Sequence, residues 1–259
     1  MTRPATAPFS RMLLAQTRSE LRMRWRIPAF SVTNLALPIV FFVFFGLPVA
    51  HLRRADGVSV GAYLLASFGA YAVGNVMVYG FGIGVANERG MKIDRLMRAS
   101  PLPPLVFMLA KVLTALVFAL LALLLLIGFG VAVGGIQQPP SVWAAVVARL
   151  LAGSLPFIAL GFSIGYVSGP NGAPAVANLI YLPLSFASGL FVPLGQLPDF
   201  VQALAPYLPS YHYAQLAWSA LGAGSETLGT SLFWLAGYTA LFLTIAVRAY
   251  RREERAKFG

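Results

Sequence analysis

The charged side chains between Glu88 and Arg98 are the residues of this chain most suited to chemistry. They comprise two acids and four cations within eleven residues, and long uncharged apolar stretches flank them. Such a cluster can bind an anionic lipid surface or a complementary protein surface. Catalytic motifs are missing from the sequence, which has two distant histidines, no cysteine and no Gly-Lys-Ser/Thr phosphate loop. We therefore expect no catalytic site, no metal site and no cofactor bound by this chain.

The elements that must position this cluster are membrane-spanning helices. The chain is 58% hydrophobic and only 10% charged, against about 25% charged in soluble domains. Several uncharged stretches are long enough to cross a hydrocarbon core of about 30 Å. We expect an all-α integral membrane protein with one transmembrane domain, residues 1–259. The six expected spans are Phe30–Ala50, Val60–Ala86, Leu105–Val133, Val142–Val167, Ala173–Leu190 and Leu228–Val247.

The Lys and Arg residues predict the orientation of these spans. Sixteen of the nineteen lie before the first span, between or next to the second and third, or after the sixth. Arg53 and Arg54 alone lie in a loop on the opposite side, and Arg149 lies within the fourth span. Because cytoplasmic loops are enriched in Lys and Arg, both termini are expected to be cytoplasmic. The net charge of +11 is then explained by topology, and no nucleic-acid partner is expected.

Three further segments lie outside the spans. Residues 1–27 are expected to form an interfacial amphipathic helix at the cytoplasmic headgroups. Residues 189–211 are apolar but interrupted by prolines, which predicts a re-entrant or interfacial helical hairpin at the outer face. Residues 248–259 are expected to form a basic cytoplasmic tail.

Residues 87–104 are expected to form a short cytoplasmic helix with Asn87 as its N-cap. Ile93, Leu96 and Met97 fall on one face, and basic side chains occupy the remainder. This pattern fits equally well an interfacial helix on anionic lipid or a helix that docks into a groove of a cytosolic partner.

Inside the spans, ionisable residues are scarce. Proton- or sodium-driven carriers usually carry an ionisable relay at membrane depth, and here the candidate is Arg149, which either snorkels to the interface or lines a polar pathway. Energy for transport would have to come from another polypeptide. Aromatic residues in a bundle more often pack than contact cargo, but seven span residues are candidates for the lining of a pathway: Phe45, Phe68, Asn75, Tyr79, Arg149, Asn178 and Tyr181.

Two longer stretches carry a resemblance to a known family. The segments "NERGMKIDRLMRASPLPPLVFMLAK" and "LSFASGLFVPLGQLPDFVQALAPYLPSYHYAQ" resemble the central and closing motifs of type-2 ABC exporter permeases. The resemblance implies that residues 87–104 form a coupling helix bound by a cytosolic ATPase. The contact residues it implies are Glu88, Arg89, Lys92, Ile93, Arg95, Leu96 and Met97, and the outer gate it implies comprises Gly189, Phe191, Pro193 and Pro198.

The resemblance also implies a function. The chain would be the membrane subunit of an ATP-driven exporter in the plasma membrane of a prokaryote, moving an amphipathic or lipid-like cargo. Its partners would be two ATPase subunits that use ATP and Mg, a second permease subunit (a homodimer favoured over a heterodimer), and membrane lipid. Export of a polysaccharide or glycolipid by the same architecture, and a nucleotide-independent membrane scaffold or carrier, remain the alternatives.

Overall fold

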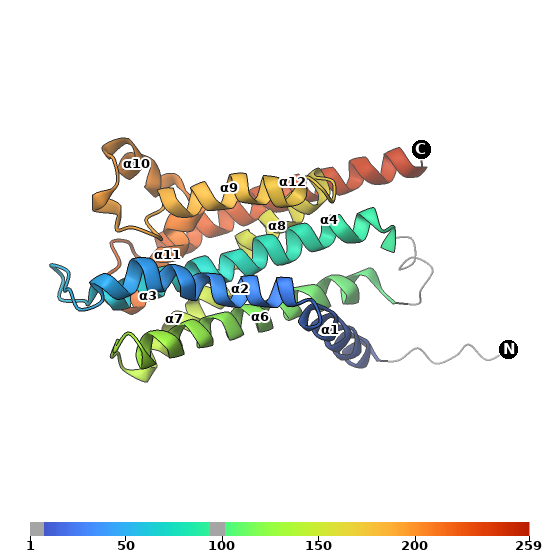
Figure 1. Cartoon of the computed structure of the whole chain (residues 1–259). Coiled ribbons are helices and arrows are strands. Elements are labelled where there is room, and N and C mark those ends of the chain that lie inside the picture. Colours follow the sequence, from blue (N-terminus) through green and yellow to red (C-terminus); the bar gives the residue numbers. More distant parts are fainter. Residues whose placement is uncertain (1–7, 94–101, 259) are drawn as a thin grey trace.

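The computed structural model describes residues 8–93 and 102–258, and helices dominate this part of the chain (Figure 1). Figure 1 shows the long helices running side by side between two ends of an elongated bundle. The end at which α1 begins, α4 ends, α6 begins and α12 ends is called the N/C end, and the other, with α10 and α11, the α11 end. The α-helices are α1 (Phe9–Trp25), α2 (Pro28–Phe41), α3 (Val60–Asn75), α4 (Gly82–Gly90), α6 (Pro104–Ala132), α7 (Pro140–Ala152), α8 (Leu155–Val167), α9 (Ala173–Ala187), α10 (Asp199–Leu204), α11 (Pro209–Ala220) and α12 (Leu228–Phe258).

Five helical segments among the described residues are long and apolar enough to cross a membrane. They are Ser31–Val49, Val60–Gly90, Pro104–Ala132, Pro140–Val167 and Leu228–Glu253. These segments confirm an all-α membrane protein and agree with five of the six expected spans.

The fifth expected span is present as the shorter apolar helix α9. Its 15 residues measure about 22 Å at 1.5 Å per residue, less than a hydrocarbon core of about 30 Å. The helix ends before the expected Leu190 because Gly189 adopts a φ of 79°, a left-handed conformation that glycine tolerates and that stops a helix.

The second span continues through three helical segments. α3 leads into a π-helical turn, η3 (Val76–Phe81), and then into α4. Every residue of α3 from Gly61 to Asn75 is buried, and α6, α11 and α2 pack around it. Ser59 caps its N-terminus by accepting a hydrogen bond from the backbone N–H of Ala62 at 3.0 Å. α3 is therefore the central helix of the bundle.

Glycines allow α8 to approach the second span closely. A Cβ at Gly165 would lie 2.9 Å from the carbonyl oxygen of Gly82, and one at Gly82 would lie 3.1 Å from that of Gly161. Small residues let membrane helices pack backbone to backbone. Gly161 and Gly165, four residues apart on α8, thus form the face that packs against the second span.

Several segments differ in detail from the sequence expectation. The fourth span is broken into α7 and α8 by a turn at Gly153–Ser154. The basic tail is no separate segment, because α12 continues as one helix to Phe258. The first span ends in a π-helical turn, η1 (Phe42–Gly46), and a 3₁₀ turn, η2 (Leu47–Val49). Residues 189–211 contain a 3₁₀ turn, η4 (Leu194–Gln196), α10, a second 3₁₀ turn, η5 (Ala205–Tyr207), and the start of α11.

Candidate functional site

Lys111 is a buried cation at the N/C end of the bundle. It lies about two turns into α6, and its side chain is only 1% exposed. Its Nζ lies 3.1 Å from Oε1 of Glu20 on α1 and also donates to Oε1 of Glu88, in the last turn of α4. One ammonium group therefore joins three helices that are distant in sequence.

Arg24 completes this cluster from α1. Its Nη1 donates to the carbonyl oxygen of Gly80 at 2.8 Å, and its Nε lies 3.9 Å from Oε2 of Glu20. A Cβ at Gly84 would lie 3.1 Å from Nη2 of Arg24, so the absence of a side chain at Gly84 leaves room for the guanidinium. Burial lowers the pKa of Arg24, and the charge of Glu20 opposes this shift.

Glu20, Arg24, Glu88 and Lys111, hereafter the Lys111 cluster, contain two acids and two cations. Removing such charges from water costs several kcal/mol per ion unless each is paired. Here the ion pairs and the carbonyl of Gly80 supply these partners. Breaking a buried pair of this kind by removing one partner typically costs about 3–5 kcal/mol. The cluster therefore fixes α1, α4 and α6 relative to one another.

Arg89, the next residue along α4, makes a second set of contacts at the same end. Its guanidinium donates to the carbonyl oxygens of Gly165 and, at 3.3 Å, Ser168. These carbonyls belong to the C-terminal end of α8, where a cation is favourable. The Nη2 of Arg89 also lies 2.7 Å from Oε2 of Glu253 on α12. Arg89 thus joins α4, α8 and α12.

Asn87 lies inside α4 and is not the N-cap of the expected helix, most of which lies outside the described residues. α4 continues to Gly90, because Glu88 and Arg89 are neutralised inside the bundle and need not leave it. The chain then turns at Lys92, which has a φ of 58°.

Lys92 is exposed and Ile93 is half-buried. The remaining predicted contact residues, Arg95, Leu96 and Met97, lie outside the described part of the chain. Glu88 and Arg89, by contrast, are half-buried, and their charged groups are paired with Lys111 and Glu253.

The structure brings part of the predicted pathway together with part of the predicted gate. The rings of Phe45 and Phe68 lie 6.5 Å apart, and Phe191 lies 6.3 Å and 5.5 Å from them. Phe45, Phe191, Pro193 and Arg54 line a cavity of about 300 Å³ at the α11 end. The other two gate residues do not line it: Gly189 lies at the turn after α9 and Pro198 directly before α10.

The polar residues among the pathway candidates are hydrogen-bonded to other parts of the bundle. Asn75 donates to Asn34 on α2 at 3.0 Å, Tyr79 donates to Asn178 on α9, and Tyr181 donates to the carbonyl oxygen of Tyr71 at 2.9 Å. Each of these bonds joins two helices.

Arg149, the remaining pathway candidate, is hydrogen-bonded to α11. Its Nη1 donates to Oγ of Ser219 at 2.9 Å, in the last turn of α11. There it also satisfies the preference of a helix C-terminus for a cation.

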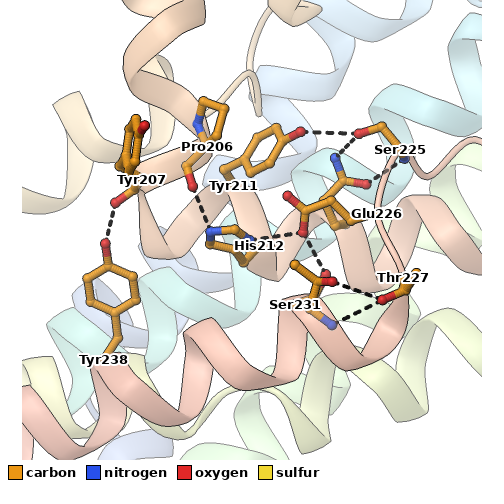
Figure 2. A network of polar contacts seen from close by, with 11 residues as sticks. Pro206, Tyr207, Tyr211, His212, Ser225, Glu226, Thr227, Ser231 and Tyr238 are labelled. Atoms are coloured by element: carbon orange, nitrogen blue, oxygen red, sulfur yellow. Dashed lines mark hydrogen bonds and ion pairs between the residues drawn. The ribbon is translucent and has the colours of Figure 1, made fainter.

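A second polar network, at the α11 end, surrounds His212 (Figure 2). Its Nε2 lies 2.8 Å from the carbonyl oxygen of Pro206, and its Nδ1 lies 3.0 Å from Oε2 of Glu226. A carbonyl oxygen only accepts, so Nε2 carries a proton. The Oγ of Ser231 also donates to Glu226, at 3.1 Å. The imidazole stacks on Trp234, with centroids 5.0 Å apart.

Sequence reasoning missed both the Lys111 cluster and the His212 network. Their members come from different helices, and no local motif contains them. Within the described ranges, no group of three His, Asp or Glu side chains is arranged to hold a metal ion. Both clusters join helices to one another, through ion pairs and hydrogen bonds.

A bundle of long apolar helices, joined at one end by buried ion pairs, defines a multi-pass α-helical membrane protein. Residues 54–248 match the family model described as "ABC-2 family transporter protein", and the chain belongs to this family. A curated Bacillus subtilis (strain 168) protein, "Putative transport permease YvfS", is 28% identical over 243 residues, covering 94% of this chain and 98% of that protein. These findings confirm the resemblance to type-2 ABC permeases, and membership of the family implies an ATPase partner.

Proposed function

We propose that this chain is the membrane subunit of an ATP-driven exporter whose energy comes from separate cytosolic ATPase subunits. Family membership and the absence of a phosphate loop from the sequence support this proposal. The proposed topology has six crossings, because α9 lies between the same two ends of the bundle as the longer helices (Figure 1). With six crossings both termini are cytoplasmic, as the Lys and Arg distribution favours.

The Lys111 cluster is the observation that carries the proposal. Glu88 lies in the last turn of α4 and Lys111 about two turns into α6, so their ion pair fixes the base of the connection between these helices, residues 91–103. The ion pair between Glu20 and Lys111 attaches α1 to the same point. A force that an ATPase applies to this loop would therefore reach α1, α4 and α6 together.

The position of the cluster refines the proposed ATPase contact. We assign the contact to Lys92, Ile93, Arg95, Leu96 and Met97. Glu88 and Arg89 instead hold the base of the loop through Lys111 and Glu253.

A second permease subunit is the partner proposed within the membrane, in a homodimer. Asn178 is exposed on the apolar helix α9, where it accepts a hydrogen bond from Tyr79. A polar side chain in an apolar segment favours a face covered by protein or lining a pathway over one that faces lipid.

The proposed cargo is amphipathic or lipid-like, such as a drug, an antibiotic or a lipid, and the membrane is the plasma membrane of a prokaryote. The rings of Phe45, Phe68 and Phe191 beside the cavity at the α11 end support this class. Two ATPase copies would bind and hydrolyse ATP with Mg. Export of a polysaccharide or glycolipid is the alternative cargo class.

The test compares two matched double variants of the full chain, co-purified with its ATPase and reconstituted in vesicles. Arg95→Glu with Leu96→Glu alters the proposed contact, and Leu52→Glu with Arg53→Glu alters an exposed Leu-Arg pair in the α2–α3 loop. We expect the first variant to lower ATPase association at least tenfold without loss of membrane insertion, and the second to leave it unchanged.

Unchanged association in the first variant would contradict the proposed contact. ATP-dependent accumulation of a fluorescent amphipath in inverted vesicles is the transport measurement. Movement of that compound without the ATPase would identify a carrier, and association without movement of any tested cargo class would identify a scaffold.

A further inference from the structure

His212 lies where three parts of the α11 end meet (Figure 2). Its imidazole is 1% exposed, its Nε2 faces the carbonyl oxygen of Pro206 in η5, and its Nδ1 faces Glu226 in the connection between α11 and α12. The ring also stacks on Trp234 of α12. One imidazole therefore links η5, the α11–α12 connection and α12.

Both ring nitrogens of His212 face oxygen atoms that accept hydrogen bonds. The carbonyl oxygen of Pro206 lies 2.8 Å from Nε2 and has no proton to donate. The Oε2 of Glu226 lies 3.0 Å from Nδ1 and also accepts from the hydroxyl of Ser231. A neutral imidazole has one N–H and one lone pair, so in either tautomer the lone pair faces one of these oxygens. The imidazolium form, with two N–H groups, satisfies both contacts.

The surroundings of the ring favour placing this second proton on His212 rather than on Glu226. Glu226 lies two residues before the first residue of α12, and an ionised carboxylate is stabilised at a helix N-terminus. Its side chain is 15% exposed and therefore in contact with solvent. The indole of Trp234 lies parallel to the imidazole, with centroids 5.0 Å apart, and a cation within about 6 Å of a Trp ring is attracted to its face.

We propose that His212 is a proton-binding site that holds η5 against the α11–α12 connection. In the closed state, with the proton bound, the ring donates to Pro206 and Glu226 together. When the proton leaves, the neutral ring keeps one of these hydrogen bonds and loses the other, and α10 with η5 separates from the connection. Because the closed state holds one more proton than the open state, it is favoured at low pH and lost as the pH rises. The proposal does not depend on the transport function.

Glu226 is the charged side chain that pairs with His212 in the described part of the chain. The other titratable side chains that Figure 2 shows around the ring are Tyr207 of η5, Tyr211 of α11 and Tyr238 of α12. The hydroxyl of Tyr211 is hydrogen-bonded to Ser225, and that of Tyr238 donates to the carbonyl oxygen of Tyr207. Tyrosine hydroxyls ordinarily lose their proton near pH 10, whereas histidine changes charge between about pH 5 and pH 8. The two kinds of group therefore respond over different pH ranges.

The first test reads the protonation state of the ring directly. The chain contains two histidines, so in a His51→Gln background His212 gives the single histidine signal. The full chain with ¹⁵N-labelled histidine is purified in detergent and titrated by NMR. We expect protons on both ring nitrogens at about pH 5.5 and on one of them at about pH 9. A ring whose protonation state stays the same over this range would overturn the proposal.

The second test measures the separation of α10 from α12. Because the chain has no cysteine, spin labels are attached through Ala203→Cys in α10 and Gly229→Cys in the first turn of α12, both at exposed positions. We expect one narrow distance distribution at about pH 5.5, whose population falls at least threefold at about pH 9 in favour of longer distances. A distribution that does not change with pH would overturn the proposal.

Glu226→Gln distinguishes a proton-dependent contact from a general effect of pH. The amide group of the new side chain can donate to Nδ1 of a neutral ring and to the hydroxyl of Ser231, so we expect the closed distribution at both pH values. His212→Gln should also abolish the pH response. His51→Gln, at an exposed histidine outside the network, is the matched control and should keep the wild-type response. A pH response that persists in Glu226→Gln or His212→Gln, or that is lost in His51→Gln, would overturn the proposal.

Discussion

The two ends of the bundle are held together by different chemistry. At the N/C end, ion pairs of the Lys111 cluster and the Arg89–Glu253 pair join α1, α4, α6 and α12. At the α11 end, aromatic rings and hydrogen bonds to backbone carbonyls join the helices, with His212–Glu226 as the polar centre (Figure 2). Separating a buried ion pair is costly, whereas apolar side chains can repack at a smaller cost. We therefore expect the helices of the N/C end to move together, and those of the α11 end to shift relative to one another.

Lys111→Met should cause a larger loss of stability than any single substitution at the α11 end. It leaves the carboxylates of Glu20 and Glu88 buried without their ammonium partner, which costs about 3–5 kcal/mol. Unfolding of the purified chain in detergent measures the change. Arg53→Met, at an exposed site of the opposite loop, is the matched control and should have little effect. A loss below about 1 kcal/mol, the scale of a surface pair, would show that the cluster is solvated.

Glu226→Gln tests the polar centre of the α11 end and should cost less than Lys111→Met. The change keeps the shape of the side chain but removes the charge beside Nδ1 of His212, and hydrogen bonds to charged groups contribute about 1.5–3 kcal/mol. The same unfolding measurement applies, with Asp199→Asn on exposed α10 as control. An effect as large as that of Lys111→Met would remove the contrast between the two ends.

Gly74→Ala tests how tightly the rings of the α11 half are packed. The new Cβ would overlap the hydroxyl of Tyr181, and overpacking of this kind costs about 1–3 kcal/mol. Gly128→Ala is the matched control, because its Cβ would meet open space and alanine favours the helix by up to about 1 kcal/mol. Rescue of Gly74→Ala by Tyr181→Phe would locate the clash at the hydroxyl, and equal stability of the two glycine variants would contradict it.

Asp56→Asn should have the smallest effect, and its sign depends on pH. Although slight desolvation raises the pKa of Asp56, hydrogen bonds from Arg54 and the backbone N–H of Val58 outweigh it and lower the pKa below its usual value. The ionised carboxylate therefore stabilises the fold above its unfolded pKa, and this contribution is lost as the pH falls through the lowered value. Wild type and Asp56→Asn should differ slightly in Tm at neutral pH and converge at low pH. A difference that grows on acidification would contradict this assignment.

Hydropathy predicted most of the fold because membrane spans are long and their composition is local. The first, second, third, fourth and sixth spans agree with long apolar helices of the structure. The bounds of α9 could not be predicted in the same way, since the positive φ of Gly189 that follows it is a property of the turn.

The Lys111 cluster was hidden from sequence reasoning for a different reason. Glu88 and Lys111 lie near the ends of apolar stretches and Glu20 lies in the basic segment before the first span, where charges are usually attributed to the membrane boundary. Only the packing of α1 against α6 and of α4 beside them shows that the ammonium group of Lys111 pairs with both carboxylates. Long-range pairing of this kind has no periodic signature in a single chain.

The unbroken course of α12 has one more consequence. Its 31 residues form a rod of about 46 Å, which exceeds a hydrocarbon thickness of about 30 Å and therefore overhangs the bilayer. When a rod of this length tilts, the displacement of each residue grows with its distance from the pivot, so the protruding end moves farthest. Because Glu253 near that tip is attached to Arg89, leaning of α12 would shift the end of α4 sideways.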